Sequence, residues 1–297
     1  MNIKPWISIL IPSYEYPEGV FRILNLIELA ENSDIECVIA DDSESNSIEL
    51  LVRSHPLYLE GKVIYIKNQP AIGAVRNWNS LLNRASGDYI LLMHHDECPE
   101  HPDFFNQLRS IIQESNNLDL VFLRCSHLAF RDTRLFFYMP HLVIVFLLRF
   151  APEFLLLHNV VGSPSNVFVR RSVCLQFDEN LKWLVDVDWM VALLNQKNIQ
   201  WSIARHLSVI SVYNSKTSIT KSLESDISKL RTEEARLIKH KLGSSVVFKL
   251  ILADTFLGKI SAKIENIIWL FLFGLIKITS YLRMLSVPEW WINANKK

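Results

Sequence analysis

The sequence has little glycine, with eight residues among 297. None of them forms the G-x-G-x-x-G pattern of dinucleotide-binding folds or the G-x-x-x-x-G-K-[ST] pattern of the P-loop. Both patterns build turns whose backbone amides approach a phosphate closely. A dinucleotide-binding fold and a P-loop are therefore not indicated.

Cysteine is also scarce, and its spacing is irregular. The chain has four cysteines and no C-x-x-C pair, and they stand at Cys37, Cys98, Cys125 and Cys174. A zinc knuckle or a disulfide-stapled scaffold needs closely or regularly spaced cysteines. The pattern speaks against both and is typical of a reducing compartment.

The chain lacks an excess of charge of either sign. Its 31 basic residues balance 31 acidic ones, so no basic field favours nucleic acid as a partner. No uninterrupted apolar run reaches the roughly 18–20 residues of a membrane-spanning helix. No signal-peptide-like segment precedes the first predicted strand, so we expect a cytoplasmic location. Hydrophobic residues nevertheless make up 49%, which allows a sizeable core.

What the chain does contain is an alternation of strand-like and helix-like apolar segments. Five short apolar runs predict strands, and apolar residues three or four apart between them predict helices. The predicted strands span residues 7–11, 37–40, 63–66, 89–93 and 120–123. Strands that alternate with helices form βαβ units. The sequence therefore predicts an α/β fold with a mainly parallel sheet flanked by helices.

The most informative stretch begins at Gly87. Tyr89 to Met93 are apolar without alternation, which predicts a strand covered on both faces. The strand leads directly into His94-His95-Asp96-Glu97. Ligands of open α/β sheets bind beyond the carboxyl ends of the strands, and adjacent carboxylates suit a hard divalent cation. The alternative is a solvated acidic turn.

A second strand end carries similar chemistry. Asp41 and Asp42 follow the predicted strand at 37–40 and offer acceptors for a base, a ribose or a metal. Arg76 stands in the first turn of a predicted helix, where its fork of donors suits a base or a diphosphate. The alternative for Arg76 is a surface salt bridge.

Four motifs in chain order resemble one family. They are Ile-Pro-Ser-Tyr at 11–14, Asp-Asp-Ser at 41–43, Gly-Ala-Val-Arg-Asn-Trp-Asn at 73–79, and Ser-Gly-Asp-Tyr-Ile-Leu-Leu-Met-His-His-Asp-Glu at 86–97. Their order and spacing resemble the family 2 inverting glycosyltransferases of the GT-A fold, of the bacterial polysaccharide or O-antigen type. The resemblance covers roughly residues 7 to 220.

The resemblance implies a donor pocket in the first half of the chain. Its residues would bind the nucleotide of a sugar donor, and they are Pro12, Tyr14, Asp41 and Arg76. A UDP-, dTDP- or GDP-sugar is the implied donor.

The resemblance also implies a metal site. The stretch from His94 to Glu97 stands where the family has an Asp-x-Asp motif, with His94 in place of the first Asp. Asp96 would then bind Mg²⁺ or Mn²⁺ directly, beside Glu97. His95 would lie at the floor of the sugar pocket, and a histidine pair that binds the metal is the alternative.

Two further carboxylates stand at a predicted helix start, where anions are favoured. Asp186 and Asp188 resemble the family's Glu-Asp-x-Asp segment, with Val185 in place of the Glu. The resemblance implies that Asp186 is the general base and that Asp188 supports it. Simple capping of the helix is the alternative.

The remaining acceptor half is less regular. The apolar segment 126–158, interrupted by prolines, predicts either a buried insertion or a flap that faces the membrane or the acceptor. Segments 199–204 and 207–212 predict paired strands. Asn214 stands where the family often has a metal-binding His, and three residues beyond it are candidates for diphosphate contacts: Lys216, Ser218 and Thr220.

The C-terminal region differs in character. We divide the chain into a catalytic domain at 1–222, with a donor half at 1–125 and an acceptor half at 126–222, and a helical region at 223–297. Residues 246–297 contain seven basic and three acidic residues, a net charge of +4, and end near Trp290 and Trp291. Basic, apolar, tryptophan-rich helices bind anionic membrane surfaces. Packing on the domain, or on a second subunit in a homo-oligomer, is the alternative.

The resemblance implies a metal-dependent inverting glycosyltransferase. Its acceptor would be a hydroxyl of a lipid-linked saccharide in surface polysaccharide synthesis, at the inner face of the cell membrane. One alternative is a nucleotidyltransferase, although Pro12 to Pro17 lack the Gly-rich loop of those enzymes. The other is a non-catalytic sugar-nucleotide-binding membrane scaffold, an interpretation that His94 and Val185 favour.

Overall fold

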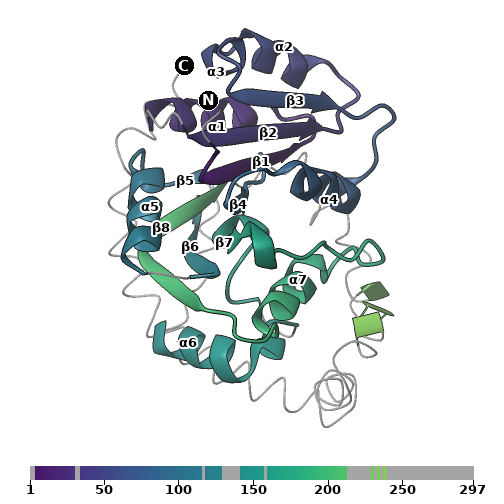
Figure 1. Cartoon of the computed structure of the whole chain (residues 1–297). Helices are drawn as coiled ribbons and strands as arrows, with labels where there is room; N and C mark the ends of the chain where they lie inside the picture. The colour runs from purple at the N-terminus through teal and green to yellow at the C-terminus, as the bar shows by residue number, and fades with distance from the viewer. Residues whose placement is uncertain are drawn as a thin grey trace.

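One sheet with helices on both faces organises the chain (Figure 1). The computed structural model describes residues 4–30, 34–115, 118–128, 141–156 and 159–212, and the pairs 229–230, 233–234 and 237–238. Among these residues the strands are β1 Ile7–Ser13, β2 Ile35–Asp41, β3 Val63–Lys67, β4 Tyr89–Leu92, β5 Glu97–Pro99, β6 Leu120–Leu128, β7 Val167–Arg170 and β8 Trp201–Val212. The helices are α1 Pro17–Leu29, α2 Ser47–Ser54, α3 Pro56–Leu59, α4 Ala74–Arg84, α5 Phe104–Glu114, α6 His141–Phe150 and α7 Val185–Leu194. Short 3₁₀ turns are η1 Pro152–Leu156, η2 Pro164–Asn166 and η3 Arg171–Val173.

The first half of the sheet is parallel. β1 pairs with β2 on one side and with β4 on the other, and β2 pairs with β3. α1 begins at Pro17, whose fixed φ suits the first helical position, and it buries the apolar positions that the sequence spacing predicted. The predicted parallel α/β arrangement is confirmed.

The second half extends the sheet with strands of mixed direction. β7 runs antiparallel to both β4 and β6, β8 runs parallel to β6, and β5 is antiparallel to β8. The strand order is therefore β3-β2-β1-β4-β7-β6-β8-β5. β5 also contacts α1, so the far edge of the sheet curls back toward the first helix.

One sequence prediction about this half is wrong. Residues 199–204 and 207–212 do not form two paired strands, because one strand, β8, runs through both. Its pairing with β6 shifts register between Leu123, opposite Ala204, and Arg124, opposite Ser208. The residues between Ala204 and Ser208 have no partner on β6. A bulge of this kind places exposed polar residues inside a strand. In the sequence, such residues between two apolar runs resemble a turn between two strands.

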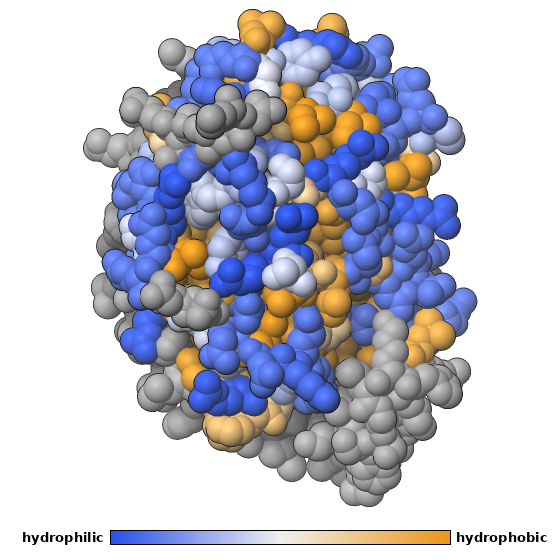
Figure 2. Space-filling view, viewed as in Figure 1, coloured by the Kyte–Doolittle hydropathy of each residue, from blue (hydrophilic) through white to orange (hydrophobic). Residues whose placement is uncertain are grey.

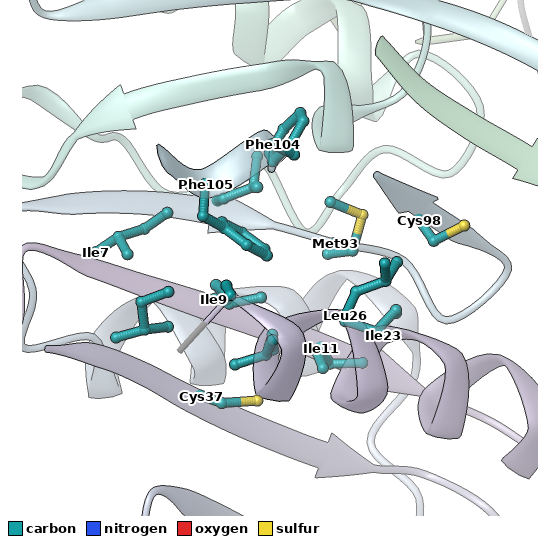
Figure 3. Packing of buried hydrophobic residues seen from close by; sticks show 14 of the residues in the cluster. Ile7, Ile9, Ile11, Ile23, Leu26, Cys37, Met93, Cys98, Phe104 and Phe105 are labelled. Carbon is teal, nitrogen blue, oxygen red and sulfur yellow. The ribbon is translucent and has the colours of Figure 1, made fainter. Parts of the chain in front are cut away.

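The core fills both faces of the sheet. Alternate side chains of β1 point to one face, where Ile7, Ile9 and Ile11 pack against residues of α1 and α5 (Figure 3). The opposite face buries Leu10 and its neighbours against α4 and α7. Burial on both faces explains why the strand residues of β4 are continuously apolar.

The apolar insertion of the second half is only partly described. Within it, α6 turns Leu148 into the core but leaves the Phe146 and Phe150 side chains 60% and 69% exposed. Apolar surface is visible at the lower end of the molecule, where α6 lies (Figure 2). No helix among the described residues has both the length and the apolarity to cross a membrane.

The C-terminal region is described only at the three residue pairs between 229 and 238. Ile238 is buried in the same cluster as Leu181 and Leu184. Ile238, which belongs to the helical region predicted at 223–297, therefore packs on the catalytic domain. The predicted diphosphate contacts around Asn214 and the predicted membrane-binding segment 246–297 lie outside the described residues.

All four cysteines are free thiols. Burial raises the pKa of each of them, so the thiols stay protonated and unreactive at neutral pH.

Candidate active site

The loops that follow β1, β2 and β4 meet at one edge of the sheet. The three strands are parallel neighbours, so their carboxyl ends lie side by side. The His95 Nδ1–H donates to the Pro12 carbonyl oxygen at 3.1 Å, and the Asp42 amide donates to the Ser13 carbonyl at 3.0 Å. The fold thus brings together predicted residues from segments far apart in sequence.

The packing of α1 against the β4 loop requires Gly19. A Cβ atom at this position would lie 1.9 Å from the His95 carbonyl oxygen and 2.7 Å from the Tyr16 ring. Any side chain would displace the loop that carries Asp96. The glycine is one of the eight in the chain, and this close approach explains it.

Asp41 is fully buried and has its acceptor positions filled by the protein. One carboxylate oxygen accepts from the Ser43 amide at 2.9 Å and from its hydroxyl at 2.5 Å. The other accepts from the Tyr65 hydroxyl at 2.6 Å and from Lys67 Nζ at 3.2 Å. Asp41 therefore orders the floor of the predicted donor pocket, and a direct contact with a base stays a prediction.

Asp42 organises the start of α4. Its carboxylate accepts from the Gly73 amide at 2.8 Å and from Asn68 Nδ2 at 2.7 Å. Gly73 has a φ of 86°, a left-handed value that glycine adopts without strain. This anchor positions the turn that carries Arg76, a role that the acidic pair at the strand end did not reveal.

Glu15 links two loops of the pocket, and the sequence analysis missed it. Its carboxylate accepts from the amides of Glu44 and Ser45 at 2.7 and 3.0 Å and from the Ser45 hydroxyl at 2.6 Å. These hydrogen bonds lower the pKa of Glu15. Its φ of 47° is unusual for a residue other than glycine, and such strain clusters at functional sites. A charged residue between two tyrosines gave no sequence signal for this clamp.

The other two predicted donor contacts lie on the surface. The Tyr14 ring is exposed beside the loop after β1. The Arg76 side chain is 68% exposed and forms a salt bridge with Glu179, with Nε 3.1 Å from the carboxylate oxygen. This is the surface salt bridge that the sequence analysis gave as the alternative for Arg76. A contact between Arg76 and a nucleotide-sugar donor stays a prediction.

His94 packs against the aromatic ring of Trp78, with ring centroids 5.0 Å apart. Burial lowers the His94 pKa to about 4, so the imidazole is neutral near pH 7. The contact of 3.4 Å between its Nδ1 and Glu97 is therefore not an ion pair under these conditions. Its Nε2 is buried and finds no hydrogen-bond partner among the described residues.

The two acidic residues after His95 have different surroundings. The Ser163 hydroxyl lies 2.7 and 2.8 Å from the two Glu97 oxygens, and Glu97 is buried as the first residue of β5. Its burial, together with the nearby charge of Asp96, raises the Glu97 pKa. Asp96 is only partly buried, and no hydrogen bond from the described part of the chain reaches its carboxylate. Asp96 is the acid that is open to a ligand.

The surroundings of Asp96 and Glu97 determine how many protein ligands a metal ion could have here. No group of three or more His, Cys, Asp or Glu side chains within the described ranges is arranged to hold a metal by itself. Mg²⁺ is commonly held by one or two carboxylates, with substrate phosphates and water completing its shell. The open carboxylate of Asp96 fits that kind of site, whereas Glu97 is engaged by serine.

The predicted base stands in the first turn of α7, as expected. Asp186 is partly buried, and burial raises its pKa to about 7. Its charge also raises the pKa of Glu97, so the two carboxylates interact electrostatically. Asp188 is buried on the same helix. The structure thus brings the predicted base toward the acid at the start of β5. The catalytic role of Asp186 and the metal-binding role of Glu97 stay predictions.

Solved structures of similar shape identify the fold. The fold is similar to that of Staphylococcus aureus TarS in complex with UDP-GlcNAc, with a TM-score of 0.61 and 15% identity over 84% of this chain and 70% of that chain. It is also similar to the mannosyltransferase PcManGT of Pyrobaculum calidifontis in complex with GDP-Man and Mn²⁺, with a TM-score of 0.52 and 10% identity over 84% and 79% of the two chains. The sheet is the GT-A fold of glycosyltransferases.

Sequence comparison adds the family. The chain belongs to glycosyl transferase family 2, whose model matches residues 8–174. It is 26% identical to an uncharacterised protein of Mycobacterium tuberculosis over 68% of each chain. It is 20% identical to an uncharacterised glycosyltransferase of Haemophilus influenzae over 72% of this chain and 71% of that protein. The protein is a glycosyltransferase, and the predicted fold and class of enzyme are confirmed.

Proposed function

We propose that the enzyme transfers a sugar with inversion from a nucleotide-sugar donor to an acceptor hydroxyl, with Asp186 as the general base. The observation that carries this proposal is the pair of unlike acids, Asp96 and Asp186. Asp96 is open at the strand ends, while the pKa of Asp186 is raised by burial to about 7. A base with a pKa near the working pH is the most effective kind.

The reaction needs one base and no covalent intermediate. Asp186 takes the proton of the acceptor hydroxyl as its oxygen forms a bond to the anomeric carbon. The bond from that carbon to the diphosphate breaks on the opposite face, and the nucleoside diphosphate leaves with the electron pair. Asp188, two residues further along the first turn of α7, would support the base.

Asp96 would hold the Mg²⁺ or Mn²⁺ ion. When bound, such an ion offsets the negative charge that develops on the departing diphosphate. Neutral His94 stands where a carboxylate would be, so Asp96 is the open acid of the motif. Glu97 could bind the ion only after breaking its hydrogen bond with Ser163. The Mn²⁺ in the PcManGT complex supports a metal at this fold.

The donor is a UDP-, dTDP- or GDP-sugar. The similar structures hold UDP-GlcNAc and GDP-Man, which supports this class of donor. The pocket would be formed by Pro12, Tyr14 and Arg76, with His95 at the sugar end. Asp41 orders its floor through Tyr65 and Lys67.

Turnover of a panel of sugar nucleotides tests the proposed function. With Mn²⁺ present and water or a saccharide as acceptor, one donor is expected to release its nucleoside diphosphate. Chromatography of the products measures this release and identifies the donor. Release of pyrophosphate from a sugar phosphate and a nucleoside triphosphate would instead identify a nucleotidyltransferase. Binding of UDP or GDP in calorimetry with no turnover of any donor would favour the non-catalytic scaffold.

The acceptor is a lipid-linked saccharide at the inner face of the cell membrane. The exposed face of α6 supports this part of the proposal, because Phe146 and Phe150 lie with ring centroids 5.1 Å apart beside the basic Arg149. Aromatic side chains beside basic ones favour the surface of an anionic bilayer. The segment 246–297, with its net charge of +4, would add a second contact.

Removing the exposed aromatic pair is expected to weaken membrane binding. F146S/F150S is predicted to bind vesicles that contain phosphatidylglycerol at least tenfold more weakly in a sedimentation assay. Full burial of one such side chain contributes about 1.5–3 kcal/mol, and about 1.4 kcal/mol is a factor of ten in binding. The matched control is L50S/L59S, which removes two side chains of similar exposure, 69% and 73%, from α2 and α3. Equal sedimentation of both double variants would contradict a membrane contact at α6.

A further inference from the structure

Glu234 lies beyond the residues matched by the family model. Its side chain is only 3% exposed. A carboxylate is rarely buried so deeply unless hydrogen bonds or an opposite charge compensate for the loss of water. The partners that compensate for Glu234 identify what it does.

Glu234 binds three consecutive backbone amides ahead of α7. One carboxylate oxygen accepts from Lys182 N at 2.6 Å and from Trp183 N at 3.1 Å. The other accepts from Trp183 N at 3.0 Å and from Leu184 N at 2.7 Å. Successive amides that converge on one anion form a nest for negative charge.

The nest places negative charge at the start of α7, where the residue at the N-cap position supplies none. Leu184 occupies the N-cap position of α7 and offers no side-chain hydrogen bond. A helix N-terminus leaves amides without partners and favours negative charge. Glu234 supplies that charge from a remote part of the chain, and Ile238, four residues on, packs in the cluster that contains Leu181 and Leu184.

The position of the nest relates it to the reaction. Asp186 follows Leu184 by two residues, in the first turn of the helix that the nest begins. Fixing residues 182–184 therefore fixes the turn from which the Asp186 carboxylate projects. Misplacing a reacting group by about 1 Å can cost on the order of 10²-fold in rate.

We propose that Glu234 is a positioning residue for glycosyl transfer, which holds the amides of residues 182–184 and thereby the turn that carries Asp186. The proposal rests on the proposed role of Asp186 as the base. It assigns to the C-terminal region a part in completing the active site, in addition to any contact with a membrane.

The test is chemical rescue of E234A. This variant is expected to lose about 10- to 100-fold in kcat for the donor that the panel identifies. Affinity for the free nucleoside diphosphate, measured by calorimetry, should change less than about twofold, because the donor loops lie elsewhere. Acetate or formate should enter the empty nest, restore part of the lost turnover and raise the melting temperature of E234A. The matched control is E233A, which removes the exposed neighbouring glutamate and should show neither the loss nor the response to acetate.

Each outcome decides the proposal. Wild-type turnover of E234A, or a loss that acetate does not reverse, would overturn it. If E234A does not fold, E234Q takes its place, since the amide keeps the shape but loses the charge. A several-fold fall in kcat with unchanged nucleotide affinity would then support the proposal, and unchanged kcat would reject it. D186N is measured in parallel: full activity there removes the base assignment, whereas acetate-dependent melting of E234A reports on the nest alone.

Discussion

An Asp186→Asn variant is expected to lose about 10²–10⁴-fold in kcat, the range that a positioned general base contributes. The substitution keeps the shape of the side chain but cannot accept the proton of the acceptor hydroxyl. Affinity for the nucleoside diphosphate should be unchanged, since Asp186 does not belong to the donor loops. Initial rates of nucleoside diphosphate release and calorimetric titration measure the two quantities.

A matched control for this variant is Asp103→Asn. Asp103 lies at the start of another helix, directly before α5, and its carboxylate accepts from the side chains of Asn106 and Gln107. It lies outside the site, so its replacement should leave turnover unchanged. A D186N enzyme that is as active as D103N would exclude Asp186 as the base.

The pH dependence of the wild-type enzyme follows from the same carboxylate. Asp186 must be ionised to act as a base, and burial raises its pKa from 3.8 to about 7. Activity should therefore be present above this pKa and be lost as pH falls through it, with kcat/KM decreasing about tenfold per unit below pH 7. The limb should disappear from the residual activity of D186N. A rate that stays constant down to pH 5 would contradict the assignment.

The same shift predicts an effect of opposite sign on stability. Between pH 4 and 7 the unfolded chain loses the Asp186 proton while the folded chain keeps it, so stability falls as pH rises. The cost is fully present above pH 7, and D186N removes it. The variant should melt a few degrees higher than the wild type at pH 8, since about 1 kcal/mol corresponds to roughly 2–4 °C in a chain of this size. The two melting curves should converge near pH 4.

Asp96→Asn is expected to have the second large effect, a fall in kcat/KM of about 10²–10³-fold together with loss of activation by Mn²⁺. Asp96 is the open carboxylate at the strand ends, so its loss removes the proposed ligand of the ion. The neutral imidazole of His94 cannot replace the missing charge. Chelation with EDTA should inactivate the wild type, and added Mn²⁺ should restore it.

Glu97→Gln separates the two acids of the motif. Glu97 is buried and bound by Ser163. If Asp96 is the direct ligand, E97Q should need a Mn²⁺ concentration for half-activation within several-fold of the wild type. D96N should show no saturable activation in the same titration. Equal loss of activation in both variants would make Glu97 a ligand as well, as the sequence first indicated.

The sequence predicted the architecture because a buried strand appears in the sequence as a run of apolar residues. The continuous apolar run at 89–93 required cover on both faces, and both clusters of the core supply it. The acids after β2 and β4 follow strands whose carboxyl ends lie along one edge of the sheet, since β2, β1 and β4 are parallel neighbours. β8 was misread, because its polar residues between Ala204 and Ser208 lie in a bulge.

The candidate site was predicted less completely. Motifs singled out Asp96, His95 and Asp186 as candidates, because the resemblance to the family implies a role for each of them. They did not separate the open Asp96 from the buried Glu97, since two adjacent acids look alike until Ser163 binds one of them. They also did not show that Asp41 is already saturated by its neighbours.

Local patterns thus determined the strands, the helices and the edge of the sheet that carries the candidate site. Long-range contacts decided which acids are open, which are engaged, and how strongly burial raises the pKa of Asp186. Long-range contacts also decided the roles of Glu15 and Glu234. Each accepts hydrogen bonds from backbone amides, which every residue type except proline possesses. An amide carries no side-chain identity, so only the folded chain reveals which carboxylate it binds.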